Sequence, residues 1–326
     1  MRKIFGAFDN RVPVVSCGVP KGSVLGPLLF LIYVNDISHS SSLLSFLLFA
    51  DDTNLFFSQK DIKILGNTVN QEFCKVANWL ACNKLSLNVK KTHFMIFKAK
   101  NKKMNHDINI KIGNEIIERV NKTNFVGLIS DDDLSWKHHI IKVTSKVSKL
   151  CGIMVRARQY LPIRTLRAVY NAMVYPYLSY CNVVWASTYP SRLDALYKVQ
   201  KKILRIITFS KYQQESRQLF ITLQLFNIYE LYSYQIGLFM YSYTKGSLLS
   251  AFSNYFSSNN TIPKHCTRSS ETFHMKFTRT NYGRFSIKYK GSMIWNTLPD
   301  VLKNIKSLPI FRKEFKTFAL NQNIDY

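Results

Sequence analysis

Acidic residues are scarce in this chain of 326 residues. It contains 19 Asp and Glu against 45 Lys and Arg, and its formal net charge is +26. This excess predicts a polyanionic partner: nucleic acid is favoured, and an anionic membrane surface is the alternative. Residues 1–130 carry a net charge of +8 and residues 131–326 one of +18. The second part is therefore expected to hold most contacts to a nucleic-acid backbone.

Paired cysteines and long apolar runs are also lacking. The six cysteines form no C-x-x-C pair, and no signal peptide precedes them. We therefore predict reduced thiols in an intracellular protein, in the nucleus or cytoplasm. Gly26 and Pro27 interrupt the longest apolar run, Val24–Val34, so we expect no transmembrane segment and no membrane partner.

The clearest chemical signal is the stretch SFLLFADDTNLFFS at residues 45–58. Apolar residues on both sides of Ala50, Asp51 and Asp52 predict two short strands joined by a tight turn. Adjacent carboxylates repel each other unless they are solvated or bound to a cation, and Mg²⁺ takes oxygen ligands of this kind. Two interpretations stay open here: a metal site for nucleotidyl transfer, or a solvated turn.

A glycine-rich loop, Cys17–Ser23, precedes this stretch. It leads into the apolar run Leu28–Asp36, where Pro27 suits the first turn of a helix and Ser23 is a candidate cap. Such a loop can point backbone N–H groups at an anion. The Walker spacing G-x-x-x-x-G-K-[ST] is missing, which argues against a P-loop ATPase. An anion-binding loop and a structural turn both stay open.

Residues 1–130 are predicted to form an α+β region. Helical spacing of apolar residues extends over Asp61–Lys84, with Asp61 in the first turn. An antiparallel sheet with helices on one face would accommodate the short strands that follow. These predicted strands are His93–Phe97, Ile108–Ile112, Ile116–Val120 and Phe125–Leu128.

Residues 131–245 are predicted to be helical throughout. A stripe of apolar residues begins after Trp136, and further helices are expected at Ile163–Tyr180, Leu193–Ile207 and Gln218–Tyr243. Lysines on the first and third of these helices form either solvated faces or contacts to a nucleic-acid backbone, and the excess of one sign favours the second. They are Lys142, Lys146, Lys149, Lys201 and Lys202.

The remainder divides into a linker at residues 246–260 and a basic, aromatic C-terminal region at residues 261–326. The linker is rich in Ser and Asn. In the C-terminal region basic and aromatic residues alternate, which suits either base stacking with phosphate contacts or an amphipathic element packed on the helices. A short closing helix is expected at Leu308–Leu320.

Several motifs occur in a fixed order. GVPKGSVLGPLLF at residues 18–30, followed by Phe49-Ala50-Asp51-Asp52, resembles the reverse transcriptase of non-LTR, jockey-like retrotransposons. Later stretches resemble the same family, and together the resemblance covers nearly the whole chain. They are NKLSLN with Lys90-Lys91-Thr92, FVGL at 125–128, LSW at 134–136 with His139-Ile140, and RTNYG at 279–283 with Trp295-Asn296 and Leu298-Pro299.

The resemblance implies a partial polymerase palm, then a helical thumb and a small basic tail. Asp51 and Asp52 would be catalytic carboxylates that bind Mg²⁺, and Lys91 would approach the triphosphate of the incoming nucleotide. RNA template and DNA primer would be the partners. The implied nucleotide and template contacts are Gly18, Pro20, Lys21, Gly22, Ser23 and Ala50, the primer grip is Phe125, Gly127 and Leu128, and the lysines named above would contact the backbone.

Lys21 and the N-terminus depart from the family pattern. The family's usual residue at position 21 is Gln, and its third metal-binding Asp lies on a strand well before the glycine-rich loop. Here 17 residues precede Gly18, so that strand and the fingers are expected on a missing upstream segment. Because two-metal catalysis needs a complete clamp, the chain is expected to be inactive alone. The alternatives are a non-catalytic nucleic-acid-binding protein and a pseudogene product.

Overall fold

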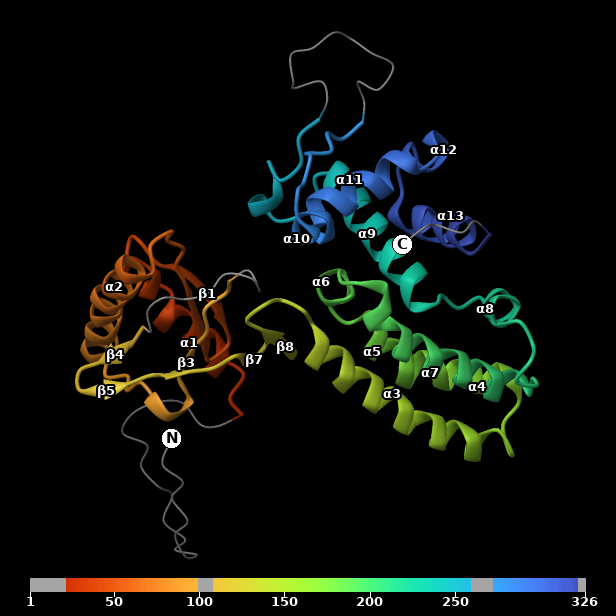
Figure 1. Cartoon of the computed structure of the whole chain (residues 1–326), viewed down its shortest axis with the longest axis horizontal. Coiled ribbons are helices and arrows are strands. Elements are labelled where there is room, and N and C mark those ends of the chain that lie inside the picture. Colours follow the sequence, from red (N-terminus) through yellow and green to blue (C-terminus); the bar gives the residue numbers. More distant parts are fainter. Residues whose placement is uncertain (1–21, 99–107, 259–271, 322–326) are drawn as a thin grey trace, which may run out of the picture. The chain divides into compact units, whose positions relative to one another are not determined.

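The computed structural model describes residues 22–98, 108–258 and 272–321 (Figure 1). The chain forms two compact units, Met1–Asn121 and Lys122–Tyr326. Both helices and strands are present, so the expected mixture of helix and strand is confirmed. The described strands form four separate two-stranded pairs instead of one sheet.

Short strands and one long helix make up the described part of the N-terminal unit. β1 and β2 pair antiparallel, as do β4 and β5, whereas β3 and β6 pair in parallel. The expected strands around residues 93–120 are thus present but only two residues long. In order the elements are α1 (Gly26–Val34), η1 (Ile37–Ser40), β1 (Ser45–Phe49), β2 (Asp52–Phe56), α2 (Ile62–Cys82), η2 (Val89–Lys91), β3 (His93–Phe94), β4 (Lys111–Ile112), β5 (Glu115–Ile116) and β6 (Glu118–Arg119).

Helix α2 organises the core of this unit. Asp61 is its N-cap, and its carboxylate accepts hydrogen bonds from the backbone N–H groups of Lys63 and Ile64 at 2.7 and 3.2 Å. Phe73 and Val76 on one face of α2 are buried with apolar residues of the neighbouring segments. Those residues are Ile37, Leu44, Ile108, Ile110 and Ile117. The apolar stripe read from the sequence therefore does face a core.

Helix α1 is apolar and yet largely exposed. Of its nine residues only Val34 is buried, and Leu28 and Ile32 are 55% and 65% exposed. Pro27 lies in the first turn, as predicted, but the N-cap is Leu25 and no side chain caps the helix. The predicted Ser23 cap is therefore wrong, because the helix begins at Gly26, three residues beyond the serine.

The C-terminal unit is a hairpin followed by helices. Its hairpin is β7 (Lys122–Phe125) with β8 (Leu128–Asp131), joined antiparallel. The later elements are α3 (Lys137–Ala157), α4 (Ile163–Val169), the π-helical turn η3 (Tyr170–Val174), α5 (Tyr175–Ser179), α6 (Asn182–Trp185), α7 (Pro190–Thr208), α8 (Ser216–Leu223), α9 (Ile228–Thr244), η4 (Ser250–Phe252), α10 (Asn281–Phe285), α11 (Ile287–Thr297), α12 (Asp300–Lys303) and α13 (Leu308–Asn321).

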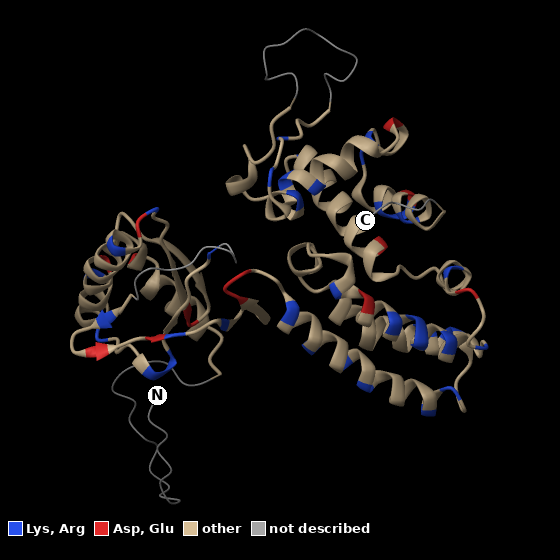
Figure 2. Cartoon of the chain, in the orientation of Figure 1, with Lys and Arg blue, Asp and Glu red and all other residues tan. Residues whose placement is uncertain are grey.

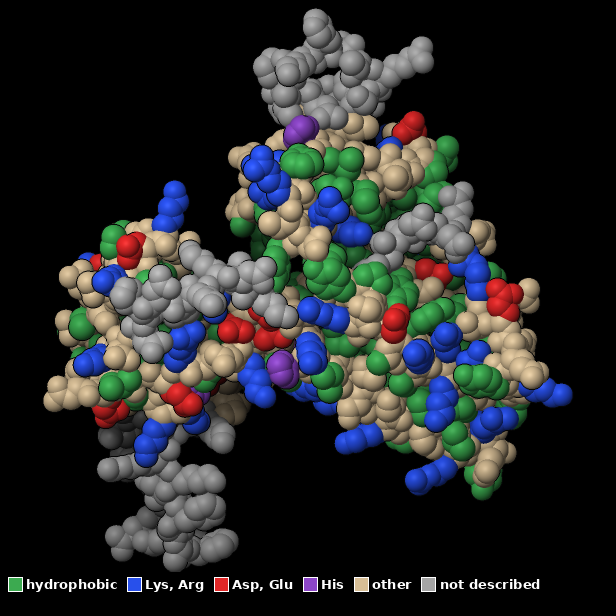
Figure 3. Space-filling view, viewed as in Figure 1, with side chains coloured by type: hydrophobic (Ala, Val, Ile, Leu, Met, Phe, Trp, Pro, Cys, Tyr) green, Lys and Arg blue, Asp and Glu red, His purple; other side chains and the backbone are tan. Residues whose placement is uncertain are grey.

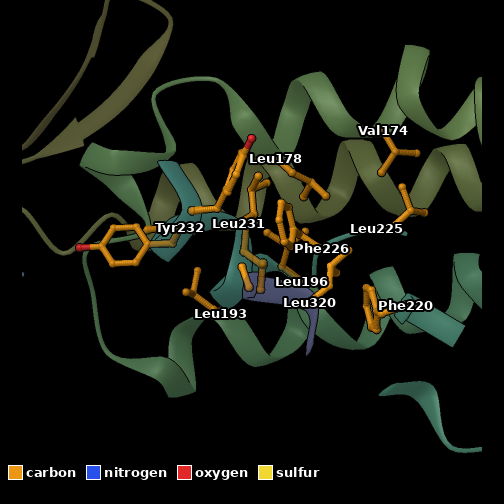
Figure 4. Close-up of a cluster of buried hydrophobic side chains, with 14 of the residues drawn as sticks. Val174, Leu178, Leu193, Leu196, Phe220, Leu225, Phe226, Leu231, Tyr232 and Leu320 are labelled. Atoms are coloured by element: carbon orange, nitrogen blue, oxygen red, sulfur yellow. The ribbon is translucent and has the colours of Figure 1, made fainter. Parts of the chain in front are cut away.

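One apolar core extends through this unit. Leu193 and Leu196 of α7, Leu231 of α9 and Leu320 of α13 come together in the cluster shown in Figure 4. Helix α9 lies against α11 and α13, and Phe256 from the predicted linker is also buried in this core. Burying each large apolar side chain stabilises the fold by roughly 1.5–3 kcal/mol, so this core is the main source of stability for the unit.

Two predicted elements are differently bounded. The helix expected at 218–243 is divided into α8 and α9, because Gln224 takes a left-handed conformation (φ 51°) and Asn227 caps a new helix. The strand expected at 125–128 is the turn between β7 and β8, with Val126 and Gly127 at positive φ. Among the described residues, no helix is long and apolar enough to cross a membrane.

Candidate metal centre and basic surface

The acidic pair lies at the tip of the β1–β2 hairpin. Phe49 pairs with Asp52 across the strands, so Ala50 and Asp51 form a two-residue turn. Ala50 has φ 51°, and tight hairpin turns of this kind require a positive φ at their first central residue. Both carboxylates are exposed. The prediction of two strands with two carboxylates at the tip is confirmed.

The two faces of this hairpin differ. Phe46, Leu48 and Leu55 are half-buried against the core of the N-terminal unit. On the opposite face Asp52 shares its side with Phe49, Leu47 and Phe56, because directly paired residues of antiparallel strands project the same way. Phe49 is 56% exposed, Leu47 45% and Phe56 44%. An exposed apolar face thus adjoins the carboxylates.

The donor set at the tip suits a hard divalent cation. Asp51 and Asp52 each offer carboxylate oxygens, which Mg²⁺ and Ca²⁺ prefer over nitrogen or sulfur. Within the described part of the chain, no salt bridge or side-chain hydrogen bond occupies these oxygens. No third His, Cys, Asp or Glu joins them in a cluster among those same residues. The two carboxylates therefore suit a divalent metal ion chemically, but they form only part of a full set of ligands.

The other residues assigned to nucleotide binding are only partly described. Lys91 ends the 3₁₀ turn η2 and is exposed, and its backbone N–H donates to the Asn88 carbonyl at 3.0 Å. Gly22 takes φ 89° just before α1, a conformation suited to glycine, and Ser23 is half-buried. Gly18, Pro20 and Lys21 lie outside the described residues. Across residues 22–98, 108–258 and 272–321, no ion pair joins Lys91 to either aspartate.

The segment assigned to the primer grip is a turn held by a helix. Phe125 ends β7 and Leu128 begins β8, where it is buried. The Tyr180 hydroxyl, just after α5, donates to the Val126 carbonyl at 2.8 Å. A Cβ on Gly127 would come 3.5 Å from the Tyr180 ring, and φ at this glycine is 79°. Glycine is therefore needed here for conformation more than for space.

Sequence reasoning missed the role of Asp131. Its Oδ1 accepts hydrogen bonds from the backbone N–H groups of Ser135 and Trp136 at 2.6 and 3.1 Å, and its Oδ2 accepts one from the Ser135 hydroxyl at 2.6 Å. Burial alone would raise the pKa of Asp131, but these hydrogen bonds outweigh it and lower the pKa. The LSW motif at 134–136 thus forms a turn that positions α3. An Asp four residues before a Ser at a helix start was the available signal.

His139, from the same motif, is a buried acceptor. Its Nδ1 accepts a hydrogen bond from the Ile129 N–H at 3.3 Å, and its ring lies 5.4 Å from that of Trp185. Burial, with a smaller contribution from Lys142, lowers the pKa of His139 to about 4. The imidazole is therefore neutral near pH 7 and acts in packing.

The predicted basic residues lie on α3 and α7, which pack together. Figures 2 and 3 show Lys and Arg along both helices and over the viewed face of the C-terminal unit. Lys146 and Lys149 are exposed and Lys142 is half-buried on α3, while Lys202 is exposed and Lys201 half-buried on α7. Helix α3 has no acidic residue and α7 has one, Asp194.

Two lysines on these helices also contact aromatic rings. Lys146 Nζ lies 5.1 Å from the centroid of the Tyr177 ring, and Lys201 Nζ lies 4.5 Å from that of Tyr197. Such cation–π contacts orient the side chains without neutralising them. The positive charge on α3 and α7 therefore remains available to an anionic partner.

Comparison with known proteins finds a family similar to the N-terminal residues. Residues 3–130 match the reverse transcriptase (RNA-dependent DNA polymerase) family. The chain is 22% identical over 226 residues to a protein described as probable RNA-directed DNA polymerase from transposon X-element of Drosophila melanogaster. The aligned region covers 66% of this chain and 24% of that protein. The chain is 25% identical over 228 residues to its counterpart from transposon BS of the same species, with 67% and 25% covered.

A further relative is the RNA-directed DNA polymerase from mobile element jockey of Drosophila funebris. Identity is 21% over 221 residues, covering 64% of this chain and 24% of the relative. The matched part thus spans about a quarter of the length of these curated relatives. No solved structure matches the chain.

Proposed function

We propose that this chain carries part of the polymerase site of a mobile element, on the premise that residues 3–130 match the reverse transcriptase family and that the chain is similar to RNA-directed DNA polymerases of transposon X-element and of mobile element jockey. The reaction is RNA-templated DNA synthesis, in which a primer 3′-hydroxyl attacks the α-phosphate of a nucleotide and pyrophosphate leaves. The observation that carries the proposal is the acidic tip, with the exposed carboxylates of Asp51 and Asp52 on a tight hairpin.

Reverse transcriptases use divalent metal ions, and Mg²⁺ is the ion we propose here. Bound at the tip, it would polarise the reacting phosphate and stabilise the leaving group. In this proposal Asp51 and Asp52 hold the ion, and Lys91 neutralises the triphosphate. Gly18, Pro20, Lys21, Gly22, Ser23 and Ala50 are assigned to nucleotide and template contacts by the same proposal.

The two regions have different proposed roles. The N-terminal unit is part of a palm, and α3 and α7 form a thumb whose lysines contact the phosphates of an RNA template and DNA primer. Phe125, Gly127 and Leu128 are assigned to the primer grip. The uninterrupted positive charge of α3 supports this assignment, because phosphate contacts contribute most of the affinity of such surfaces.

We also propose that these 326 residues do not polymerise by themselves. The tip offers two carboxylates, and a correctly clamped metal pair needs at least one more from another segment. The apolar face of Leu47, Phe49 and Phe56 beside Asp52 is where such a segment would pack. The exposure of this face supports the proposal.

Primer extension on an RNA template tests the proposal. Four proteins are compared in Mg²⁺ and in Mn²⁺: the 326-residue chain, the chain extended by the reading frame upstream of Met1, and Asp51→Asn in each. We expect synthesis from the extended chain alone, reduced at least about a hundredfold by Asp51→Asn. If Asp51→Asn leaves synthesis unchanged, Asp51 is not part of the catalytic site. If the 326-residue chain synthesises DNA, the proposal that it is inactive alone is wrong.

A non-catalytic nucleic-acid-binding function is the second candidate. The basic faces of α3 and α7 favour it, since they need no metal ion. Under this alternative Asp51→Asn leaves the affinity for nucleic acid unchanged or slightly improved, because it removes one negative charge. Absence of synthesis from every form, together with salt-sensitive binding, would favour this function over the first.

A further inference from the structure

A pocket of about 510 Å³ lies within the C-terminal unit. Its walls come from the turn before α3, from α6, the start of α7 and the segment between them, from α9 and η4, and from residues 281–287. Six of its fifteen lining residues are aromatic, and a single one, Arg192, is charged. The aromatic members are Trp136, Tyr189, Phe239, Phe252, Tyr282 and Phe285. Its volume is in the range of pockets that take small ligands.

Hydrogen bonds hold the aromatic walls in place. The Asn281 side-chain amide donates to the Tyr189 hydroxyl at 2.7 Å, and the Tyr282 hydroxyl donates to the Asp133 carbonyl at 2.9 Å. The rings of Tyr189 and Phe285 meet edge to face, with centroids 5.0 Å apart. Because these side chains are already ordered, a ligand loses little affinity to arranging them.

Arg192 places a cation beside the rings. Its Nη1 donates to the Ser135 carbonyl at 2.5 Å and to the Thr188 hydroxyl at 3.2 Å, and its guanidinium carbon lies 5.3 Å from the centroid of the Tyr189 ring. A planar, electron-rich ligand can stack on such a ring and guanidinium surface. The pocket therefore favours a flat heteroaromatic group over a flexible aliphatic one.

Two rings of the pocket are partly exposed, and the segment that carries one of them is basic. Tyr282 and Tyr189 are 49% and 41% exposed. Residues 276–288 supply two of the pocket's aromatic rings and carry four exposed cations without an Asp or Glu. These cations are Lys276, Arg279, Arg284 and Lys288. Aromatic rings inside a pocket can bind the base of a nucleotide, and cations at the surface can bind its phosphate.

We propose that this pocket binds an unstacked base of single-stranded nucleic acid, while the cations of residues 276–288 contact the neighbouring phosphates. Base stacking on aromatic side chains is tolerant of sequence, since every base has a π-face. RNA and DNA share this chemistry. The site adds to the proposed polymerase function and does not depend on it, because base binding needs neither Mg²⁺ nor Asp51.

The ligand itself provides the first test. The full 326-residue chain is titrated, in EDTA and at fixed salt, into fluorescent 12-mers of single-stranded RNA or DNA and into matching oligomers with abasic sites. The abasic strands keep every phosphate and lose the bases. We expect them to bind roughly fivefold to a hundredfold more weakly, as the loss of stacking predicts. A preference between RNA and DNA identifies the natural strand.

Variants then locate the site. Tyr282→Ala should weaken binding of the normal oligomers within the same range and leave the abasic oligomers unaffected. Tyr282→Phe keeps the ring and should retain most of the affinity. Tyr160→Ala, which removes a tyrosine that is 84% exposed outside the pocket, is the matched control. The dependence of affinity on salt should be the same in all of them, because the phosphate contacts are unchanged.

The proposal is overturned if the chain binds normal and abasic strands with equal affinity. The pocket would then be a site for a side chain of a protein partner. The proposal is also overturned if Tyr160→Ala weakens binding as much as Tyr282→Ala. The abasic comparison uses the unmodified chain, so it holds even if a variant fails to fold. EDTA removes divalent metal ions from every binding measurement. The binding result therefore does not depend on whether the chain supports primer extension.

Discussion

At the scale of single residues, the neutral His139 ring makes the stability of the C-terminal unit depend on pH. Its pKa is lowered from 6.5 to about 4 by burial. The unfolded chain therefore binds a proton at a higher pH than the folded chain does. Stability is complete above about pH 6.5 and falls as the pH drops toward 4.

The expected size of this effect follows from the shift. Between pH 6.5 and pH 5 the His139 contribution to the free energy of unfolding falls by about 1.5 kcal/mol. His139→Leu should remove that part of the pH dependence, measured by urea unfolding at both pH values. His39→Gln, an exposed histidine of the N-terminal unit, is the control. An unchanged pH dependence in His139→Leu contradicts the prediction.

Asp131 is expected to contribute to the stability of the C-terminal unit by a similar amount. Asp131→Ala removes the acceptor of three hydrogen bonds at the start of α3 and leaves two buried or half-buried backbone N–H groups without it. We expect a loss of about 3 kcal/mol in unfolding free energy. Asp132→Ala, at the adjacent position, should change stability by under about 0.5 kcal/mol. Equal effects from both variants would show that the charge, and not the hydrogen bonding, matters.

The lowered pKa of Asp131 also makes the stability of the folded chain depend on pH. The contribution of this carboxylate is present above its unfolded pKa of 3.8 and is lost as pH falls through the lower folded value. Its effect therefore lies below the range in which His139 titrates. Acid unfolding of the Asp131→Ala variant should be less steep below pH 4 than that of the original chain.

At the scale of elements, the sequence predicted those parts that local chemistry determines. The β1–β2 hairpin and α2 follow from alternation and from the helical stripe, and Asp61 is a strong cap. The break between α8 and α9 was missed, because Gln224 is not a usual residue for a left-handed turn. The capping box of Asn227 and Glu230 was visible in the sequence and could have located it.

The candidate metal site was predictable only in part. Asp51 and Asp52 are adjacent in the sequence, so their placement at one tip needed no tertiary information. By contrast, the aromatic pocket joins Trp136 to Tyr282 and Phe285, which are about 150 residues away along the chain. Such a pocket depends on how helices pack, and no local pattern specifies that.

The packing of α9 on α13 gives a prediction for a single glycine. A Cβ on Gly237 would meet the Phe315 ring at 2.3 and 2.5 Å, and the ring is fully buried. Gly237→Ala should therefore cost about 1–3 kcal/mol of unfolding free energy, because the ring cannot move freely. Gly152→Ala on α3 meets nothing within 4 Å.

The Gly152 variant is the matched control for this helix contact. Alanine should stabilise α3 by about 0.5–1 kcal/mol through its better helix propensity. Opposite signs for the two glycines in thermal unfolding are the expected outcome. A neutral Gly237→Ala variant would mean that α9 and α13 are less closely packed than described.

At the scale of the whole molecule, the excess of positive charge predicts salt-dependent binding to nucleic acid. The double variant Lys201→Gln, Lys202→Gln removes two proposed phosphate contacts on α7. The slope of log affinity against log salt should become less steep by about 1.4 for single strands. Lys60→Gln with Lys63→Gln removes the same charge near the start of α2. An equal change in both variants would assign the effect to net charge instead of a specific surface.

Helix α1 has a consequence for denaturant unfolding. The urea m-value and the heat capacity of unfolding scale with the apolar surface that water gains when the chain unfolds. Leu28, Leu29, Leu31 and Ile32 already face water in the folded protein, so this helix adds little to either quantity. The N-terminal unit should therefore unfold with a smaller m-value per residue, and a broader transition, than the C-terminal unit.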